Sequence, residues 1–166
     1  MDASTEAIRS EMLRLLPRLR RFCFALTGSA ADGDDLVQDT IERALRHLHS
    51  WVPGTRLDSW MFRIAKNRFV DGRRAARRES LAMARNLAAT DGGTIDGQRI
   101  AEAQLTLGAV DKAFQHLPAD QREAVVLVLI EGLSYREAAD ILEVPVGTLT
   151  SRIARARATL AEATGG

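Results

Sequence analysis

The chain has 166 residues, of which 46% are hydrophobic and 27% are charged, and its formal net charge is +1. This composition is ordinary for a globular protein and excludes disorder throughout, while the length allows one ordinary domain or two small ones. No apolar run reaches about 18 residues and the first residues lack a signal-peptide layout, so we expect no membrane insertion and a cytoplasmic location.

The residues that build most catalytic centres are scarce. Cys23 is the single cysteine, which excludes an internal disulfide and a cysteine-based zinc site. His47 and His49 lie two apart on an expected helix and point in different directions, so no metal site is predicted. No constellation of nucleophile, metal ligands or phosphate loop is present. The sequence therefore predicts a protein that is not an enzyme, with no cofactor and no small-molecule substrate.

Apolar residues recur at helical spacing along nearly the whole chain, and no alternating strand pattern occurs, which predicts an all-α fold. The expected helices span residues 4–26, 30–49, 58–79, 98–116, 119–131, 134–143 and 148–162. Gly, Asp and Thr concentrate over 87–98, which predicts a flexible linker. We predict an N-terminal domain over 1–80, a linker over 81–100 and a C-terminal domain over 101–166. Residues 80–86 either prolong the preceding basic helix or start the linker.

The helix expected over 30–49 has one apolar and one acidic face. The apolar stripe consists of Val37, Ile41, Ala44, Leu45 and Leu48. The opposite face consists of Asp35, Gln38, Asp39, Glu42 and Arg46. An acidic face repels DNA, so a macromolecule bound here should be a protein with basic or polar donors. The alternative is a face that is simply solvated.

Positive charge concentrates in the next segment. Between Trp51 and Ser80 there are eight basic and three acidic residues, giving +5, whereas the first fifty residues have seven and eight, giving −1. In the helix that starts near Asp58, Met61, Phe62, Ala65, Phe69 and Ala76 share the side expected to be buried. The opposite arc holds Arg63, Lys66, Asn67, Arg73, Arg74 and Arg77. Such an arc fits a nucleic-acid backbone, although a solvated face is the alternative.

A loop with tryptophans at its ends precedes the basic helix. Pro53 and Gly54 force the chain to turn there, and Trp51 and Trp60 flank the turn. Aromatic and polar side chains beside a basic helix could receive a base turned out of the duplex, because stacking on the ring replaces base stacking. The alternative is that the tryptophans anchor the loop by packing.

The segment Ala124 to Ile130 is apolar on all sides, which indicates a helix enclosed by its neighbours in the core of the C-terminal domain. Its β-branched residues also suit a strand. The flanking residues and the helices that follow favour the helix.

The pattern from Leu133 to Leu160 indicates two short helices joined by a tight turn. Ser134 can cap the first helix together with Glu137, and Pro145 stops it. The second helix is expected to restart after Gly147. Its buried stripe is Leu149, Ile153, Ala156 and Leu160, and its polar face is Thr148, Ser151, Arg152, Arg155 and Thr159. This arrangement is typical of a helix-turn-helix that reads the major groove, although a hairpin with solvated arginines would share it.

Taken together, these segments resemble the bacterial sigma factors of the extracytoplasmic-function (ECF) group of the sigma-70 family. Residues 35–45 resemble the segment that docks on the clamp helices of RNA polymerase. Residues 57–78 resemble the helix that reads and opens the −10 promoter element, and residues 117–160 resemble the domain that reads the −35 element. The segments occur in family order and cover nearly the whole chain.

The resemblance implies a role for specific residues. Polymerase docking falls on Asp35, Gln38, Asp39 and Arg43, and −35 reading falls on Thr148, Ser151, Arg152 and Arg155. Reading of the −10 element falls on Asn67 with the basic arc Arg63, Lys66, Arg73, Arg74 and Arg77, and the loop from Trp51 to Asp58 would hold a flipped base. Glu143 departs from the family, whose members commonly have Gly at this turn; if the backbone is left-handed there, Glu costs on the order of 1 kcal/mol.

The partners implied by the resemblance are RNA polymerase core, promoter DNA and an anti-sigma protein. A helix-turn-helix repressor or activator that acts without polymerase is a second hypothesis, but it leaves the acidic face and the Asp58 helix unused. A protein-binding adaptor is a third, and it predicts no salt-dependent affinity for DNA.

Overall fold

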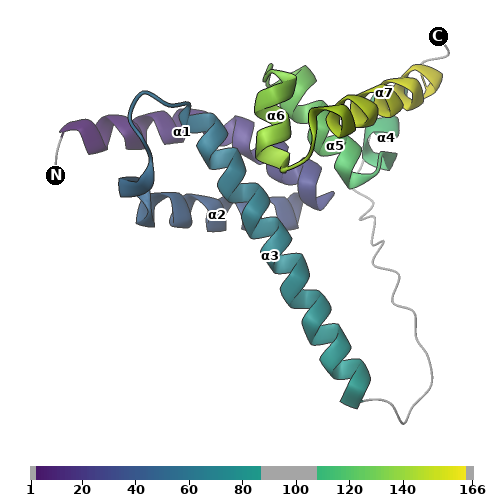
Figure 1. The fold of residues 1–166 in the computed structure, drawn as a ribbon, viewed down its shortest axis with the longest axis horizontal. Helices are drawn as coiled ribbons and strands as arrows, with labels where there is room; N and C mark the ends of the chain where they lie inside the picture. Colours follow the sequence, from purple (N-terminus) through teal and green to yellow (C-terminus); the bar gives the residue numbers. More distant parts are fainter. Residues whose placement is uncertain (1–2, 87–107, 164–166) are drawn as a thin grey trace.

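The computed structural model describes residues 3–86 and 108–163, and every regular element in these two ranges is helical. We call the two ranges the N-terminal half and the C-terminal half (Figure 1). The all-α class predicted from the sequence is confirmed. Within the described ranges, no helix is both long enough and apolar enough for a membrane crossing.

The helix bounds follow the predicted order closely. In the N-terminal half they are α1 Ala3–Thr27, α2 Ala30–Arg46, the 3-10 helix η1 Leu48–Ser50 and α3 Leu57–Asn86. In the C-terminal half they are α4 Ala109–His116, α5 Ala119–Val125, the π-helix η2 Val126–Ile130, α6 Tyr135–Leu142 and α7 Val146–Ala163. Residues 80–86 prolong the basic helix. The expected linker over 87–98 and the start of the helix expected over 98–116 lie outside the described residues.

The N-terminal half packs α1, α2 and α3 around one buried cluster. Phe22 of α1 and Phe62 of α3 meet edge to face, with ring centroids 5.2 Å apart and planes at 67°. Both rings are buried, as are Leu19 and Met61 beside them. Aromatic pairs in this geometry add to the stabilisation that burial provides. The pair therefore fixes the start of α3 against α1.

Glycines at the start of α2 bring α1 and α2 close together. A Cβ on Gly33 would lie 3.3 Å from the backbone of Phe24, so a larger residue would push the two helices apart. Gly28 has φ +73°, which a residue with a side chain adopts only with strain. Ser29 then caps α2 by accepting a hydrogen bond from the backbone N–H of Asp32 at 3.3 Å.

The buried side of α2 differs from the predicted stripe. Leu45 is 44% exposed, so its prediction as a core residue is wrong, while Leu36, Thr40 and Ala44 are buried. Both α1 and α3 cover α2, and this moves the centre of its buried arc toward Leu36. The Thr40 hydroxyl is satisfied within the helix, because it donates to the carbonyl of Leu36 at 2.6 Å.

Helix α3 is anchored only at its beginning. Leu57, Met61, Phe62 and Ala65 are buried, whereas every residue over 71–86 is exposed. The prediction that Ala76 lies in the core is therefore wrong, because no described element covers this part of the helix (Figure 1). The basic second half of α3 projects into solvent.

The apolar segment Ala124 to Ile130 is helical, as predicted, but it changes its winding. The N–H of Glu131 donates to the carbonyl of Val126 at 2.8 Å, which is the five-residue spacing of a π-helix. Leu129 and Ile130 are 42% and 52% exposed, so the expectation of full enclosure is wrong for these two residues. The wider turn directs Glu131 toward α1 instead of continuing the α-helical register.

The helix-turn-helix forms as predicted, except that its second helix begins earlier than expected. Ser134 accepts from the N–H of Glu137 at 3.1 Å, and the Glu137 carboxylate accepts from the N–H of Ser134 at 2.8 Å, so the capping box is confirmed. Glu143 ends α6 in the left-handed region, with φ 55° and ψ 45°. The second helix, α7, already begins at Val146, so Gly147 lies inside it.

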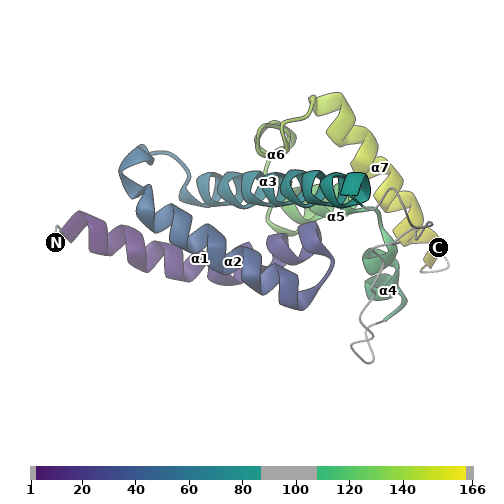
Figure 2. The same ribbon diagram turned by 90° about the horizontal axis from the view of Figure 1, so that it is seen from below.

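The two halves pack against each other. Helix α1 contacts α5 and η2, and α3 contacts α6, so one apolar cluster runs through both halves (Figure 2). Arg122 of α5 joins the halves directly, because its guanidinium donates to the carbonyl of Ala25 at 3.1 Å and to that of Leu117 at 2.7 Å. The sequence indicated two domains but not this contact.

Candidate nucleic-acid and protein interfaces

Helix α7 presents the predicted polar face because its opposite face is buried. Leu149, Ile153 and Ala156 are 0%, 2% and 0% exposed. Thr148, Ser151 and Arg155 are exposed on the other side. The buried stripe fixes the rotation of the helix, so these donors point to solvent together. That arrangement suits a helix that enters a major groove.

Two hydroxyls at the start of α7 bond to the helix itself. Thr150 donates to the carbonyl of Val146 at 2.9 Å, and Ser151 donates to that of Gly147 at 3.1 Å. Their oxygens retain lone pairs, and each hydroxyl can rotate to donate to a phosphate or a base edge. The intrahelical bond of Ser151 therefore leaves its hydroxyl able to bond an outside partner.

Arg152, also assigned to the −35 reading face, differs from its neighbours because it is paired. Its guanidinium lies 3.3 Å from Asp120 and 3.5 Å from Glu123, and its side chain is only 19% exposed. Both carboxylates belong to α5. The sequence placed Arg152 on the exposed face, but the structure turns its guanidinium inward.

The basic arc of α3 is mostly open to solvent. Arg63, Asn67, Arg73, Arg74 and Arg77 are exposed. The Arg73 guanidinium lies 5.7 Å from the centre of the Phe69 ring, in a cation–π contact. Lys66 is the exception, because its ammonium lies 2.6 Å from the Glu123 carboxylate and its side chain is 15% exposed.

Glu123 therefore binds one cation from each predicted DNA-reading helix. Its side chain is 4% exposed and contacts Lys66 of α3 and Arg152 of α7. Burial raises the pKa of the Glu123 carboxyl above its usual value, although the Lys66 ammonium acts in the opposite direction. Sequence reasoning missed this residue. The sequence did contain one signal. Glu123 lies four residues before the apolar Leu127 and so shares its buried helix face, and a carboxylate on a buried face requires a cation nearby.

The loop before α3 forms a small groove against α1. Trp51 is partly buried, and its indole Nε1 has no hydrogen-bond partner among the described residues. The groove is lined by Ser4, Ala7, Ile8, Glu11, Trp51, Pro53, Thr55 and Leu57. Because the indole nitrogen is buried, only the ring itself is available to stack on an unstacked base, and a partly buried ring equally fits the alternative of a packing anchor.

Asp58 lies in the first turn of α3, where its carboxylate joins several elements. Arg56 donates to its carboxylate at 2.7 Å, Arg18 lies 2.9 Å from the same oxygen, and the N–H of Ser59 donates at 2.7 Å. Burial would raise the pKa of Asp58, but the hydrogen bonds from Arg56 and Ser59 outweigh it and the pKa lies below its ordinary value. As an anion, Asp58 thus joins Arg56 of the loop before α3 to Arg18 of α1.

The polar face of α2 lies on the outside of the molecule. Asp35, Gln38, Asp39 and Arg43 are all exposed, as the prediction of a protein-binding face requires. Asp39 also accepts from Arg68 of α3 at 2.8 Å, with the two side chains 52% and 36% exposed. An exposed pair of this kind contributes little to stability and can exchange for a partner's charges.

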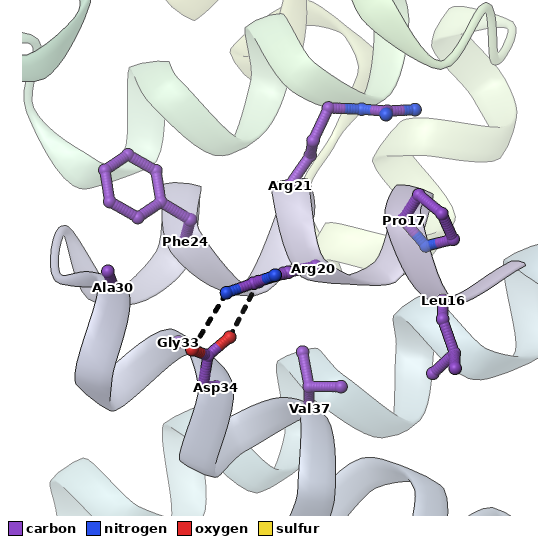
Figure 3. Close-up of a pocket in the computed structure, with 9 residues that line it drawn as sticks. All are labelled: Leu16, Pro17, Arg20, Arg21, Phe24, Ala30, Gly33, Asp34 and Val37. Atoms are coloured by element: carbon purple, nitrogen blue, oxygen red, sulfur yellow. Dashed lines mark hydrogen bonds and ion pairs between the residues drawn. The ribbon is translucent and has the colours of Figure 1, made fainter.

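A groove that the sequence did not indicate runs beside this face (Figure 3). It lies between α1 and α2, and an ion pair from Arg20 to Asp34 at 2.8 Å crosses it. Its apolar lining comes from Leu16, Pro17, Phe24 and Val37. An apolar groove next to a polar face is a common composition for a protein interface.

No group of metal-ligating side chains occurs among the described residues. Cys23 is buried between the helices of the N-terminal half, and burial raises the pKa of its thiol to about 12. A thiol with such a pKa is a poor nucleophile and a poor metal ligand. Cys23 therefore acts as a small core residue.

Comparison with known proteins identifies the class of both halves. The family described as Sigma-70 region 2 matches residues 12–79, and the family described as Sigma-70, region 4 matches residues 107–160. The first match contains α2 and most of α3, and the second contains the helix-turn-helix. These are the segments whose surfaces are described above.

Curated relatives define the group more narrowly. The chain is 40% identical over 159 residues to the ECF RNA polymerase sigma factor EcfG of Rhodopseudomonas palustris, covering 94% of this chain and 84% of the relative. It is 28% identical to SigW of Bacillus subtilis over 86% of this chain and 81% of that relative. The chain belongs to the ECF sigma factors of the sigma-70 family, and it is a non-enzymatic factor that directs initiation of transcription.

Solved structures match both halves in one superposition. The sigma factor RpoE of Bartonella quintana, solved in complex with the anti-sigma factor NepR, gives a TM-score of 0.74 at 33% identity, covering 96% of this chain and 98% of that chain. CnrH, solved in complex with the cytosolic domain of CnrY, gives a TM-score of 0.61 at 29% identity over 95% and 86% of the two chains. The confirmed points are the family, the all-α fold and the helix-turn-helix.

Proposed function

We propose that this sigma factor uses three surfaces. The outer face of α2 docks on polymerase, α3 with its preceding loop reads the −10 element, and α7 reads the −35 element. The observation that carries this assignment is the burial of Leu149, Ile153 and Ala156, which points the polar face of α7 outward. The other basic helix, α3, gives the same chain a second surface that can bind a second promoter element.

For the −10 element, the exposed arginines of α3 supply phosphate contacts and the loop supplies a base site. Arg73, Arg74 and Arg77 lie on the projecting part of the helix, where a duplex can approach without meeting any other element of residues 3–86 and 108–163. Trp51 offers a ring for stacking, and Asn67 offers an amide that bonds base edges. Phosphate contacts provide affinity, and the base contacts provide the sequence preference.

For polymerase, the α2 face provides a mixed surface of the kind that protein interfaces use. Asp35, Gln38, Asp39 and Arg43 supply the polar contacts, and the neighbouring groove near Val37 supplies apolar area. Polymerase bound here would hold the two DNA-reading halves at the spacing that a promoter requires. Each engaged half then raises the effective concentration of the other at its element.

We also assign an anti-sigma protein as a partner. The support is that the RpoE and CnrH structures, which match both halves of this chain, were solved with NepR and with the cytosolic domain of CnrY. A protein that covers the same halves here would block promoter reading.

The test is reconstituted transcription from a genomic promoter library by polymerase core plus this chain, with start sites sequenced. The wild type should start at a subset of promoters, and Asp39→Ala should weaken binding to core while thermal unfolding is unchanged. Glu162→Ala, which removes an exposed carboxylate at the far end of α7, serves as the matched control and should bind core normally. Promoter-independent operator binding by a dimer of the chain would refute the proposal in favour of a repressor or activator.

A further inference from the structure

The loop between η1 and α3 is bonded near its two ends and open at its tip. The N–H of Trp51 donates to the carbonyl of Leu48 at 3.1 Å. Thr55 donates to the carbonyl of Val52 twice, from its N–H at 3.1 Å and from its hydroxyl at 2.6 Å. At the tip, Val52 is 62% exposed, and no atom of the described residues lies within 4 Å of a Cβ built on Gly54. Apolar packing therefore does not set the position of the tip.

The end of the loop is held by an ion pair with two hydrogen bonds. Arg56 donates to both oxygens of the Asp58 carboxylate, from Nε to Oδ1 at 3.1 Å and from Nη2 to Oδ2 at 2.7 Å. A planar guanidinium bonded to both oxygens of a carboxylate has a defined orientation. The Asp58 side chain is only 9% exposed, so water competes little for these bonds. The pair therefore fixes the direction in which the chain leaves the loop and enters α3.

The same carboxylate is bonded to α1. Arg18 Nη2 lies 2.9 Å from Asp58 Oδ2, and the Arg18 guanidinium lies 5.7 Å from the centre of the Phe62 ring. Arg18 follows Glu11 by two helical turns and so lies on the same face of α1. Glu11 lines the groove that the loop forms against α1. The contacts from Arg18 through Asp58 to Arg56 therefore connect the two walls of this groove, α1 and the loop, which Figure 1 shows passing over α1.

Only a carboxylate makes this connection fully. Burial acts to raise the pKa of Asp58, but the hydrogen bonds from Arg56 and Ser59 hold that pKa below its ordinary value, so the group is an anion at neutral pH. An asparagine has one acceptor oxygen and an NH2 group, and the NH2 group would face one of the two guanidinium groups. Replacing Asp58 by asparagine therefore keeps the size of the side chain but releases one wall of the groove from the other.

We propose that Asp58 is a positioning residue for promoter reading: by bonding Arg56 and Arg18 at once, it holds the loop at the distance from α1 at which an unstacked base of the −10 element fits against Trp51. The proposal rests on the base-reading role proposed above for the loop. Asp58 contacts no base itself. A loop that is already ordered loses less conformational entropy when the base binds, so the stacking energy appears as affinity.

The test measures binding of the polymerase holoenzyme to a promoter fragment that is duplex upstream and has only the non-template strand across the −10 element. Each −10 position is replaced in turn by an abasic site. The wild type should lose about tenfold in affinity at one position, since the stacking of a base on an aromatic ring has this size. Asp58→Asn should lose no more than about twofold at that position. Because the ratio of two affinities does not depend on the fraction of folded protein, a loss of stability alone cannot produce this result.

Three further variants separate the contact from other effects. Asp71→Asn removes the same charge from an exposed position on α3 and should keep the wild-type ratio. Glu137→Gln removes the charge that lies 3.0 Å from Arg56 in the C-terminal half, while glutamine still caps α6, and it should also keep the ratio. Arg56→Gln should lower the ratio as far as Asp58→Asn does. The double variant should lower it no further, because both residues act through one contact.

Two outcomes would overturn the proposal. One is a wild-type ratio in Asp58→Asn, even if this variant binds the intact and the abasic fragment more weakly, because equal weakening is the result of a purely structural role. The other is a ratio lowered equally by Glu137→Gln, since the C-terminal half would then hold the loop. In both cases the wild type still discriminates, and only the positioning role fails. If the wild type itself tolerates an abasic site at every position, the proposed base-reading role of the loop fails first.

Discussion

The two basic helices, α3 and α7, differ in how the fold supports them. Over its 18 residues α7 is anchored near its start, middle and end by Leu149, Ile153 and Ala156 with the half-buried Leu160. The 30-residue α3 has its buried residues only up to Ala65, and residues 71–86 are all exposed. Packing therefore sets the orientation of α7 along its length, but it sets that of α3 only at one end.

This difference suits the two proposed tasks. A helix that reads base edges in a groove needs a fixed rotation about its axis, which a continuous buried stripe provides. A helix that contacts the phosphates of an opening duplex needs positive charge along an exposed length, and its rotation about its axis matters less. The difference also means that substitutions in the exposed part of α3 should change DNA binding without changing stability. Substitutions in α7 should often change both.

The largest expected effect concerns the anchored end of α3. Phe62→Ala should lower the free energy of unfolding by about 3–5 kcal/mol, because it removes a buried ring and its edge-to-face contact with Phe22. Chemical denaturation followed by circular dichroism measures it. Met83→Ala, on the projecting part of the same helix, is the control and should change the free energy by less than about 0.5 kcal/mol. Similar losses in the two variants would show that the far end of α3 is also packed.

The next effect concerns the contact that Arg122 makes between the two halves. Arg122→Ala should cost about 2–3 kcal/mol, because the guanidinium donates to carbonyls at the ends of α1 and α4, including those of Ala25 and Leu117. Arg122→Lys keeps the charge but cannot donate in several directions from a planar group, so its loss should be intermediate. Calorimetry provides the readout: the wild type should unfold in one transition and Arg122→Ala in two. A single unshifted transition would contradict the role of Arg122 as a joint.

A smaller effect separates the two kinds of arginine on α7. In the polymerase holoenzyme, Arg152→Ala should weaken recognition of the upstream element by about 1–3 kcal/mol, because base-edge contacts have this magnitude. Arg157→Ala removes the same charge from an exposed position outside the proposed reading face and is the control. Promoter choice, read by sequencing start sites, should shift for the first variant only. Unchanged promoter choice in Arg152→Ala would mean that its pairing with Glu123 is purely structural.

Sequence reasoning succeeded where the interacting residues are close along the chain. The capping box of Ser134 and Glu137 spans three residues, and the buried stripe of α7 follows from helical period alone. Glu123 was missed because its partners Lys66 and Arg152 are 57 and 29 positions away. The pair of Arg18 and Glu131 is separated by 113 positions, and the π-turn that directs it leaves no local signature. The predicted faces were therefore correct mainly where a single helix determines them, and incomplete where the other half of the molecule supplies the partner.

The smallest expected effect is a gain in stability at the turn before α7. Glu143 has φ 55° and ψ 45°, so its Cβ is strained in the left-handed region, as its departure from the family pattern suggested. Glu143→Gly should therefore raise the free energy of unfolding by up to about 1 kcal/mol, reduced by the greater flexibility of glycine in the unfolded chain. Glu143→Ala keeps the Cβ and the strain, so it should show no such gain in the same denaturation experiment. Equal stabilisation by both variants would trace the effect to the lost carboxylate, and the turn would then have no bearing on how firmly α7 is held.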